Sequence, residues 1–240
     1  MRFNGHDTSV IRLYDSTKYT QHGYKLLCFC VRSKGYNQTH IYGKGVGYTC
    51  VTLTMKYFKT IQTLTIDSEL AVKAKAFARQ VTPTIGSPGS GYRDTHQSNL
   101  QKIENDHFVS KMGEEAVRIV FEKFGREVKG PDYQIYDGKQ KSWASDLYID
   151  GLGLAVKTQS ISLAKKFRLS WTFQLGTQRK DPILNDAEAW VCFVEFNEST
   201  HKCRVFPPYQ IKELTFGEPR LEKLKGSKKV VYAKDLPILI

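Results

Sequence analysis

The sequence predicts an α+β N-terminal domain, with an antiparallel sheet and one helix, followed by an α/β core whose mixed sheet is flanked by helices. Three observations predict this arrangement. Short β-rich pieces precede one amphipathic helix, residues 84–91 are rich in proline, glycine and serine, and helical and strand-like periods alternate after residue 105. We therefore expect domains at 1–82 and 101–240, joined by a flexible linker at 83–100.

The N-terminal elements follow from β-propensity and from one apolar helix face. Residues 24–31 are mostly apolar and rich in β-formers, and strand-like pieces follow at 39–42 and 47–54. Asp67 is a typical helix N-cap, and Pro83 ends the segment that it begins. The apolar face of this helix consists of Leu70, Ala74, Phe77 and Val81. We expect the helix to cover the N-terminal sheet.

The spacing of apolar residues predicts the helices and strands of the C-terminal region. Residues 105–124 carry apolar side chains at helical spacing, and Gly125 is well placed to end that helix. Residues 189–196 are almost continuously apolar and predict a central buried strand. Further strands are expected at 203–206 and 230–233, and a short helix at 208–214.

Residues 145–159 carry the pattern most informative about chemistry. Polar side chains at positions 146, 148 and 150 alternate with Leu147 and Ile149, which is the two-residue period of a strand. Gly151 follows an aspartate in a turn, and a second apolar strand then runs to Lys157. The predicted hairpin therefore places an acid, Asp146, and a lysine at corresponding positions of two paired strands.

Net charge, apolar runs and cysteine content indicate the kind of binding partner and the cellular location. A net charge of +12 and a pI near 9.4 favour an anionic partner, of which nucleic acid is the commonest. The longest apolar runs fall short of the roughly 18 to 20 residues that a membrane span needs. Five cysteines in no repeated spacing fit reduced thiols, and Cys28, Cys30, His40 and Cys50 lack zinc-finger spacing. We expect a soluble protein in the cytoplasm of a bacterial cell or a phage-infected host.

The order of a helix with Glu, a strand with Asp and a strand with Lys resembles the PD-(D/E)xK nuclease superfamily, also called restriction-endonuclease-like. The resemblance covers residues 105–235. It implies that Asp146 is a bridging metal ligand and that Lys157 orients or deprotonates the attacking water. Glu114 would be the helix glutamate that reaches the metal. The implied cofactor is Mg²⁺, which Mn²⁺ can replace.

One position departs from the family pattern. The residue two places before the lysine is usually Glu, Asp or Gln, whereas Ala155 stands there and cannot bind a metal. The resemblance then gives Glu114 a larger role and leaves one open for Gln159, two residues beyond Lys157. Glu115 is the alternative helix acid, although its spacing from the apolar positions fits less well.

A second stretch of the sequence also matches the residue types of the PD-(D/E)xK motif. Pro131 and Asp132 are followed by Asp137, Gly138 and Lys139, but only four residues separate the two halves. This turn-rich composition predicts a loop, not two paired strands. Asp137 and Lys139 therefore remain alternates to the hairpin residues.

Residues 23–82 resemble the compact DNA-binding domains of the plant ethylene-response type, which also occur in phage and mobile-element endonucleases. In such domains a three-stranded sheet lies in the major groove of double-stranded DNA. The resemblance implies that basic side chains of this region contact phosphates or base edges, namely Arg32, Lys34, Lys44, Lys56 and Lys59.

The sequence predicts a site-specific, Mg²⁺-dependent DNA endonuclease, acting in restriction or in phage or mobile-element interference with competing DNA. The main alternative is a non-catalytic, sequence-specific DNA-binding protein of replication or transcription with a degenerate nuclease domain, which Ala155 allows. An RNA-processing nuclease is a further option. A homodimer is the simple way for one metal site to cut both strands. The sequence holds no P-loop, so it gives no support to an ATP-driven role.

Overall fold

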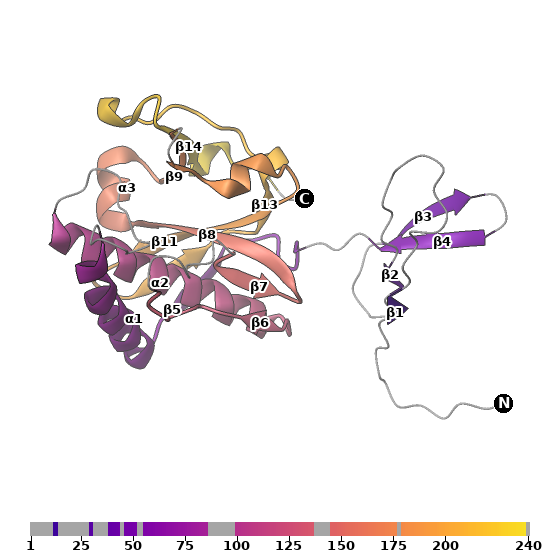
Figure 1. The fold of residues 1–240 in the computed structure, drawn as a ribbon, viewed down its shortest axis with the longest axis horizontal. Helices are drawn as coiled ribbons and strands as arrows, with labels where there is room; N and C mark the ends of the chain where they lie inside the picture. Colours follow the sequence, from indigo (N-terminus) through magenta and orange to yellow (C-terminus); the bar gives the residue numbers. More distant parts are fainter. Residues whose placement is uncertain are drawn as a thin grey trace. The chain divides into compact units, whose positions relative to one another are not determined.

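A computed structural model describes residues 12–13, 29–30, 38–43, 46–51, 55–85, 99–136, 145–176 and 179–238. The chain divides into two compact units, Met1–Thr54 and Met55–Ile240 (Figure 1). Within the described residues, no helix has the length and apolar character that crossing a membrane requires.

The first unit contains short antiparallel pairs. Strand β1 (Arg12–Leu13) pairs with β2 (Phe29–Cys30), and β3 (Gln38–Gly43) pairs with β4 (Val46–Val51). The antiparallel character expected for this region is therefore present in these pairs. Arg32, Lys34 and Lys44 lie outside the described residues.

The predicted domain boundary and the predicted packing of the first helix are wrong. Helix α1 (Ser68–Val81) lies in the second unit and packs on α2 (Leu100–Lys123). Strand β5 (Gln62–Thr65), just before α1, pairs with β12 (Lys202–Val205) near the other end of the chain. The boundary thus falls after Thr54, because the apolar face of α1 is buried within the second unit and not on the N-terminal sheet.

The N-cap expected for α1 and the glycine expected to end α2 are confirmed, whereas α2 begins at Leu100 and not at the expected residue 105. Asp67 caps α1, because its Oδ1 accepts a hydrogen bond of 2.8 Å from the backbone N–H of Leu70. Asn99 caps α2 in the same way through the N–H of Lys102 at 3.0 Å. Gly125, with φ of +70°, follows the end of α2 as predicted.

A mixed sheet forms the centre of the second unit and confirms the predicted core architecture. Within the described residues it has seven strands. Two of them are β5 and β12, and the others are β6 (Val128–Lys129), β7 (Leu147–Ile149), β8 (Leu152–Ser160), β11 (Trp190–Asn197) and β13 (Tyr209–Gln210). The order is β5-β12-β11-β8-β7-β6, and β13 also pairs with β11. Strands β8 and β11 are parallel and the other pairs are antiparallel. The predicted buried strand is β11.

The sheet is covered differently on its two faces (Figure 1). Helices α1 and α2 lie on one face, where Val117 and Phe121 pack against Leu154 and Val156. A smaller sheet, β10 (Arg179–Lys180), β9 (Ser170–Gly176) and β14 (Lys228–Tyr232), lies over the other face. Because side chains of a strand alternate between faces, β8 contributes to both layers.

Short helices complete the second unit. Helix α3 (Ile161–Phe167) connects β8 to β9. The 3₁₀ helices are η1 (Thr82–Thr84), η2 (Pro182–Asn185), η3 (Ile211–Glu213), η4 (Glu222–Leu224) and η5 (Ala233–Asp235). The short helix expected at 208–214 corresponds to β13 followed by η3. Of the predicted linker, 86–98 lies outside the described residues.

Candidate active site

The candidate site lies where the pairing between β7 and β8 stops. Leu147 pairs with Leu154 as the last rung of this hairpin, while β8 continues to Ser160. Asp146 comes immediately before β7, and its Oδ2 accepts a hydrogen bond of 2.7 Å from the backbone N–H of Val156. This bond orients the Asp146 carboxylate beyond the last paired residues of the hairpin. The predicted placement of Asp146 and Lys157 at corresponding positions of two paired strands is wrong, because the pairing ends at Leu147 and Leu154.

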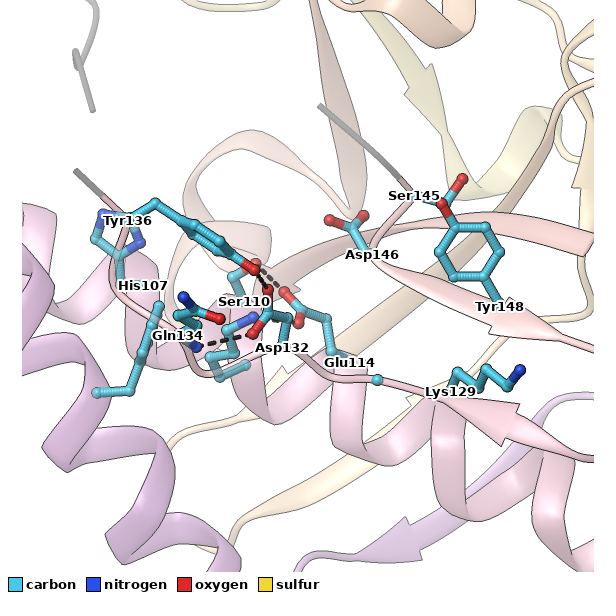
Figure 2. Close-up of a pocket in the computed structure, with 13 residues that line it drawn as sticks. His107, Ser110, Glu114, Lys129, Asp132, Gln134, Tyr136, Ser145, Asp146 and Tyr148 are labelled. Atoms are coloured by element: carbon cyan, nitrogen blue, oxygen red, sulfur yellow. Dashed lines mark hydrogen bonds and ion pairs between the residues drawn. The ribbon is translucent and has the colours of Figure 1, made fainter. Parts of the chain in front are cut away.

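Helix α2 brings Glu114 to the same place. The residue is only 4% exposed, and its carboxylate accepts hydrogen bonds from Ser110 Oγ at 3.2 Å and Lys111 Nζ at 2.5 Å. Figure 2 shows the Glu114 carboxylate from α2 and the Asp146 carboxylate from the start of β7 facing the same pocket. This pocket has a volume of about 430 Å³.

A glycine allows α2 to approach β8 closely beside this pocket. A Cβ atom on Gly113 would lie 1.8 Å from Thr158 Oγ1, far inside van der Waals contact. The neighbouring Glu114 therefore reaches the pocket from a helix that lies directly on the strand carrying Lys157.

Burial perturbs both acids. The pKa of Glu114 is raised to about 7, and burial is the main cause; the charge of Lys111 opposes the rise, and the negative charge of Asp146 adds to it. Asp146 is exposed as a residue, yet burial of its carboxylate raises its pKa, against the N–H of Val156 and the charge of Lys157. Perturbed acids that face one cleft are typical of functional sites.

Lys157 faces a second pocket, of about 590 Å³, on the other side of Asp146. Its Nζ donates a hydrogen bond of 2.9 Å to Asp181 Oδ2 and lies 5.1 Å from the centre of the Phe173 ring. Ser110 and Asp146 line this pocket as well as the one that contains Glu114. The structure thus places Asp146 between Glu114 and Lys157, each in an adjoining pocket.

Two of the alternative site residues, Glu115 and Gln159, form hydrogen bonds with other parts of the second unit. The Glu115 carboxylate accepts a 2.7 Å bond from Arg118 and a 2.9 Å bond from the Tyr133 hydroxyl, and the side chain is almost fully buried. Gln159 lines the Lys157 pocket, but its Oε1 accepts the N–H of Ser170 at 2.8 Å. The structure therefore favours Glu114 over Glu115 as the acid that faces a pocket. Asp137 and Lys139 lie outside the described residues.

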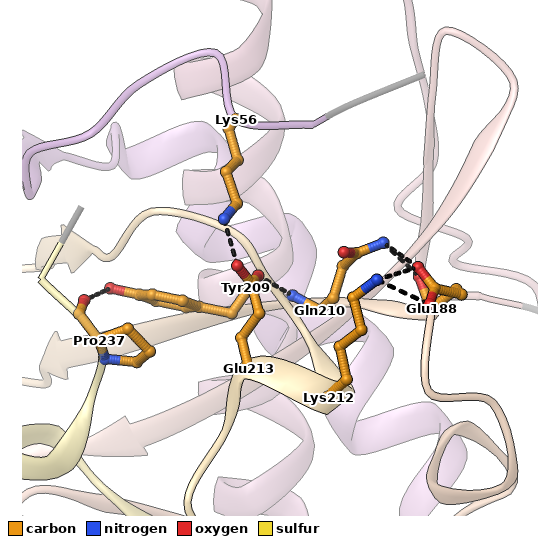
Figure 3. Close-up of polar contacts among 7 residues, drawn as sticks. All are labelled: Lys56, Glu188, Tyr209, Gln210, Lys212, Glu213 and Pro237. Atoms are coloured by element: carbon orange, nitrogen blue, oxygen red, sulfur yellow. Dashed lines mark hydrogen bonds and ion pairs between the residues drawn. The ribbon is translucent and has the colours of Figure 1, made fainter. Parts of the chain in front are cut away.

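Two basic residues assigned to the N-terminal DNA-binding sheet belong to the second unit. Lys56 forms an ion pair with Glu213, whose Oε2 also accepts the N–H of Gln210 at 2.8 Å (Figure 3). Lys59 is an exposed residue of the same unit. Their assignment to the N-terminal domain is wrong, because the boundary between the units precedes them.

The acids of the site suit a hard cation only in part. Within the described residues, no group of three or more His, Cys, Asp or Glu side chains is arranged to hold a metal ion. Glu114 and Asp146 provide two carboxylates that face one pocket, and Mg²⁺ commonly binds through one or two carboxylates with waters and substrate phosphates. Glu114 and Asp146 could therefore supply two ligands of a Mg²⁺ ion, and substrate phosphates and waters would have to supply the others.

Three residues near the site were not expected from the sequence: Ser110, Lys111 and Asp181. Ser110 and Lys111 precede Glu114 by four and three residues, which places them on its helix face, so spacing could have indicated them. Asp181 lies 24 residues from Lys157 in the chain, and no sequence pattern links the two.

Comparisons with known protein families, with curated proteins and with solved structures find no match to this chain.

Proposed function

We propose that the second unit is a Mg²⁺-dependent endodeoxyribonuclease that hydrolyses phosphodiester bonds of double-stranded DNA. The observation that supports this most directly is the position of Asp146, between a buried glutamate and a lysine from two other elements. The biological setting that we propose is restriction, or phage or mobile-element interference with competing DNA.

The order of elements around these residues also supports the proposal. Glu114 lies on α2, Asp146 precedes β7, and Lys157 lies on β8. Helix α3 and the strand β11, which is parallel to β8, follow in the chain. The resemblance to PD-(D/E)xK nucleases rests on this succession of a helix with Glu, a strand with Asp, a strand with Lys, a helix and a buried strand, although β9 and β10 stand between α3 and β11.

Each side chain has a distinct role in the proposed reaction. A bound Mg²⁺ would polarise the scissile phosphate and activate a water molecule. Asp146 and Glu114 would hold it, and the Val156 N–H keeps the Asp146 carboxylate oriented. The Lys157 ammonium offsets the negative charge that builds on the phosphoryl oxygens as water attacks phosphorus and the P–O bond breaks.

Positive charge near the site supports a polyanionic substrate. Lys102, Arg220 and Lys228 line the Lys157 pocket, and the chain carries a net charge of +12. We propose that Arg32, Lys34 and Lys44 of the first unit add contacts that select a DNA site. A homodimer would let two such sites cut both strands.

A cleavage assay tests this proposal. Duplexes of varied sequence are incubated with the protein and Mg²⁺ or Mn²⁺, with EDTA as the metal-free control. We expect Asp146→Asn and Lys157→Met each to lower the cleavage rate by about 100-fold or more, because each removes charge needed in the transition state. Glu114→Gln should also inactivate the enzyme.

Asp150→Asn is a matched control, because it removes an acid at the other end of the same strand, and Asn tolerates the φ of +48° at that position. We expect it to cleave like the wild type. Full cleavage by both Asp146→Asn and Lys157→Met would overturn the site assignment.

The second candidate function is sequence-specific DNA binding without cleavage. Ala155 favours it, because the strand position two residues before Lys157 offers no metal ligand. This candidate predicts binding that weakens steeply with salt, no cutting with any divalent ion, and no heat signal when Mg²⁺ or Mn²⁺ is titrated into the protein. Mg²⁺-dependent cutting that Asp146→Asn abolishes would exclude it.

A further inference from the structure

We infer that Asp181 is a positioning residue of the site: it holds the Lys157 ammonium in the pocket beside Asp146. The inference rests on the proposed nuclease function, since it assigns Asp181 a part in that reaction. Asp181 would act through Lys157, without contact to the substrate.

The contact between the two side chains is direct. Lys157 Nζ and Asp181 Oδ2 are 2.9 Å apart, which is the length of a charge-assisted hydrogen bond. The side chains are only 26% and 21% exposed, so solvent screens their attraction less than it screens a surface pair. Asp181 and Lys157 line the same pocket as Asp146.

The Asp181 carboxylate is itself held by the backbone of β9. Its Oδ2 accepts a hydrogen bond of 3.0 Å from the N–H of Gln174, and the Asp181 N–H donates one of 3.1 Å to the carbonyl oxygen of Gln174. These reciprocal bonds fix both the main chain and the side chain of Asp181 on the edge of the smaller sheet. A fixed acceptor can impose one position on a flexible partner.

Lys157 needs such a partner because its side chain has four rotatable carbon–carbon bonds and would otherwise sample many positions. The Phe173 ring, 5.1 Å from the ammonium, limits the motion on one side. The bond to Asp181 limits it further, and the ammonium lies close enough to the Asp146 carboxylate for its charge to lower the pKa of that acid.

The position of Ala155 explains why this acid comes from another element. Ala155 lies two residues before Lys157 and on the same face of β8. It packs against the apolar cluster that contains Trp171 and Phe173. Position 155 is half-buried against apolar side chains, which would partly desolvate an acid there, whereas Asp181 approaches Lys157 from the neighbouring sheet with its own hydrogen bonds.

Steady-state cleavage of DNA with Mg²⁺ tests the inference in the full-length protein. Asp181→Asn keeps the size and the acceptor oxygen but removes the charge. We expect kcat to fall by about 10- to 100-fold with KM for DNA within about two-fold of the wild type, because a misplaced catalytic group slows chemistry more than binding. Asp181→Glu, which keeps the charge, should recover most of the rate.

Asp186→Asn is the matched control, since Asp186 is an exposed aspartate of the same connection and lines neither pocket. It should retain the wild-type kcat. An equal kcat for Asp181→Asn and the wild type would overturn the role of Asp181 and leave the nuclease proposal intact. A wild-type protein that cuts no DNA under any condition would remove both.

A second readout does not depend on cleavage. Amine labelling followed by mass spectrometry compares the reaction rate of Lys157 with that of the exposed Lys165 as an internal reference. We expect Asp181→Asn to raise the relative labelling of Lys157 several-fold, because the ion pair no longer holds the amine, and Asp186→Asn to leave it unchanged. Unchanged labelling in Asp181→Asn would refute the ion pair on which the inference rests.

Discussion

Replacing Glu114 by glutamine should change how the stability of this protein depends on pH. The Glu114 residue is 4% exposed and lies near Asp146, and both facts disfavour the ionised form of its carboxyl group. In the folded protein its pKa is raised from 4.5 to about 7. Because the folded state holds this proton more tightly than the unfolded state, the wild-type protein must lose stability as the pH rises through that range.

The size of this stability change follows from the shift in the pKa of Glu114. A change from 4.5 to about 7 corresponds to about 3 kcal/mol, at about 1.4 kcal/mol for each pH unit. The group contributes its full stability below pH 4.5 and has lost it above pH 7. Between pH 5 and pH 8 the difference is about 2.5 kcal/mol, since part of the loss already occurs below pH 5.

Urea denaturation at pH 5, 6, 7 and 8 in the presence of EDTA measures this difference. Glutamine cannot ionise, so Glu114→Gln should gain about 2.5 kcal/mol relative to the wild type between pH 5 and pH 8. Effects that do not depend on pH, such as a change in packing, cancel in this comparison. The attraction of Lys111 for the ionised carboxylate does depend on pH, and it is already included in the pKa of Glu114. Glu104→Gln, on the same helix, controls for removal of a glutamate from a partly exposed ion pair.

A stability difference between Glu114→Gln and the wild type that stays constant from pH 5 to pH 8 would refute the reasoning. Added Mg²⁺ gives a further check, because an ion that binds the ionised carboxylates of the folded state stabilises it. Mg²⁺ should therefore stabilise the wild type at pH 8 and have a smaller effect on Glu114→Gln.

Three further substitutions test the packing around the site, each by its free energy of unfolding. Gly113→Ala should destabilise the protein by about 2 kcal/mol or more, because its Cβ would lie 1.8 Å from Thr158 Oγ1; a neutral result would contradict the close contact of helix and strand. Thr158→Val should stabilise by about 1 kcal/mol, since the buried hydroxyl has no hydrogen-bond partner within the described residues, and any loss of stability would count against this. Arg118→Met should cost about 3 kcal/mol by leaving buried Glu115 without its counter-charge, and a loss below about 1 kcal/mol would argue against that pair.

Much of the second unit was predictable because its signals are local. The helix expected at 105–124 is α2, and the strand expected at 189–196 is β11, both recognised from the period of their apolar residues. The hairpin was recognised from alternation and from the turn at Gly151. These features depend on neighbours a few residues away in the chain.

The misplaced boundary shows where local signals end. The apolar face of α1 predicts a helix that is buried on one side, but periodicity does not state which surface it covers. The deciding contacts are the packing of α1 on α2 and the pairing of β5 with β12, across some 140 residues. Lys56 was assigned to the N-terminal domain for the same reason, since its ion-pair partner Glu213 lies 157 residues away in the chain.

The sequence by itself determined the hairpin, with Lys157 on its second strand, and the helix that carries Glu114, whereas Asp146, expected within the first strand, precedes it. It did so because strand and helix periods set the face of each residue. Only the tertiary structure decided that Glu114 faces a pocket with Asp146 while Glu115 is buried against Arg118. It also brought Asp181 to Lys157 from the smaller sheet, because long-range packing, and not chain neighbours, determines which side chains meet across two layers.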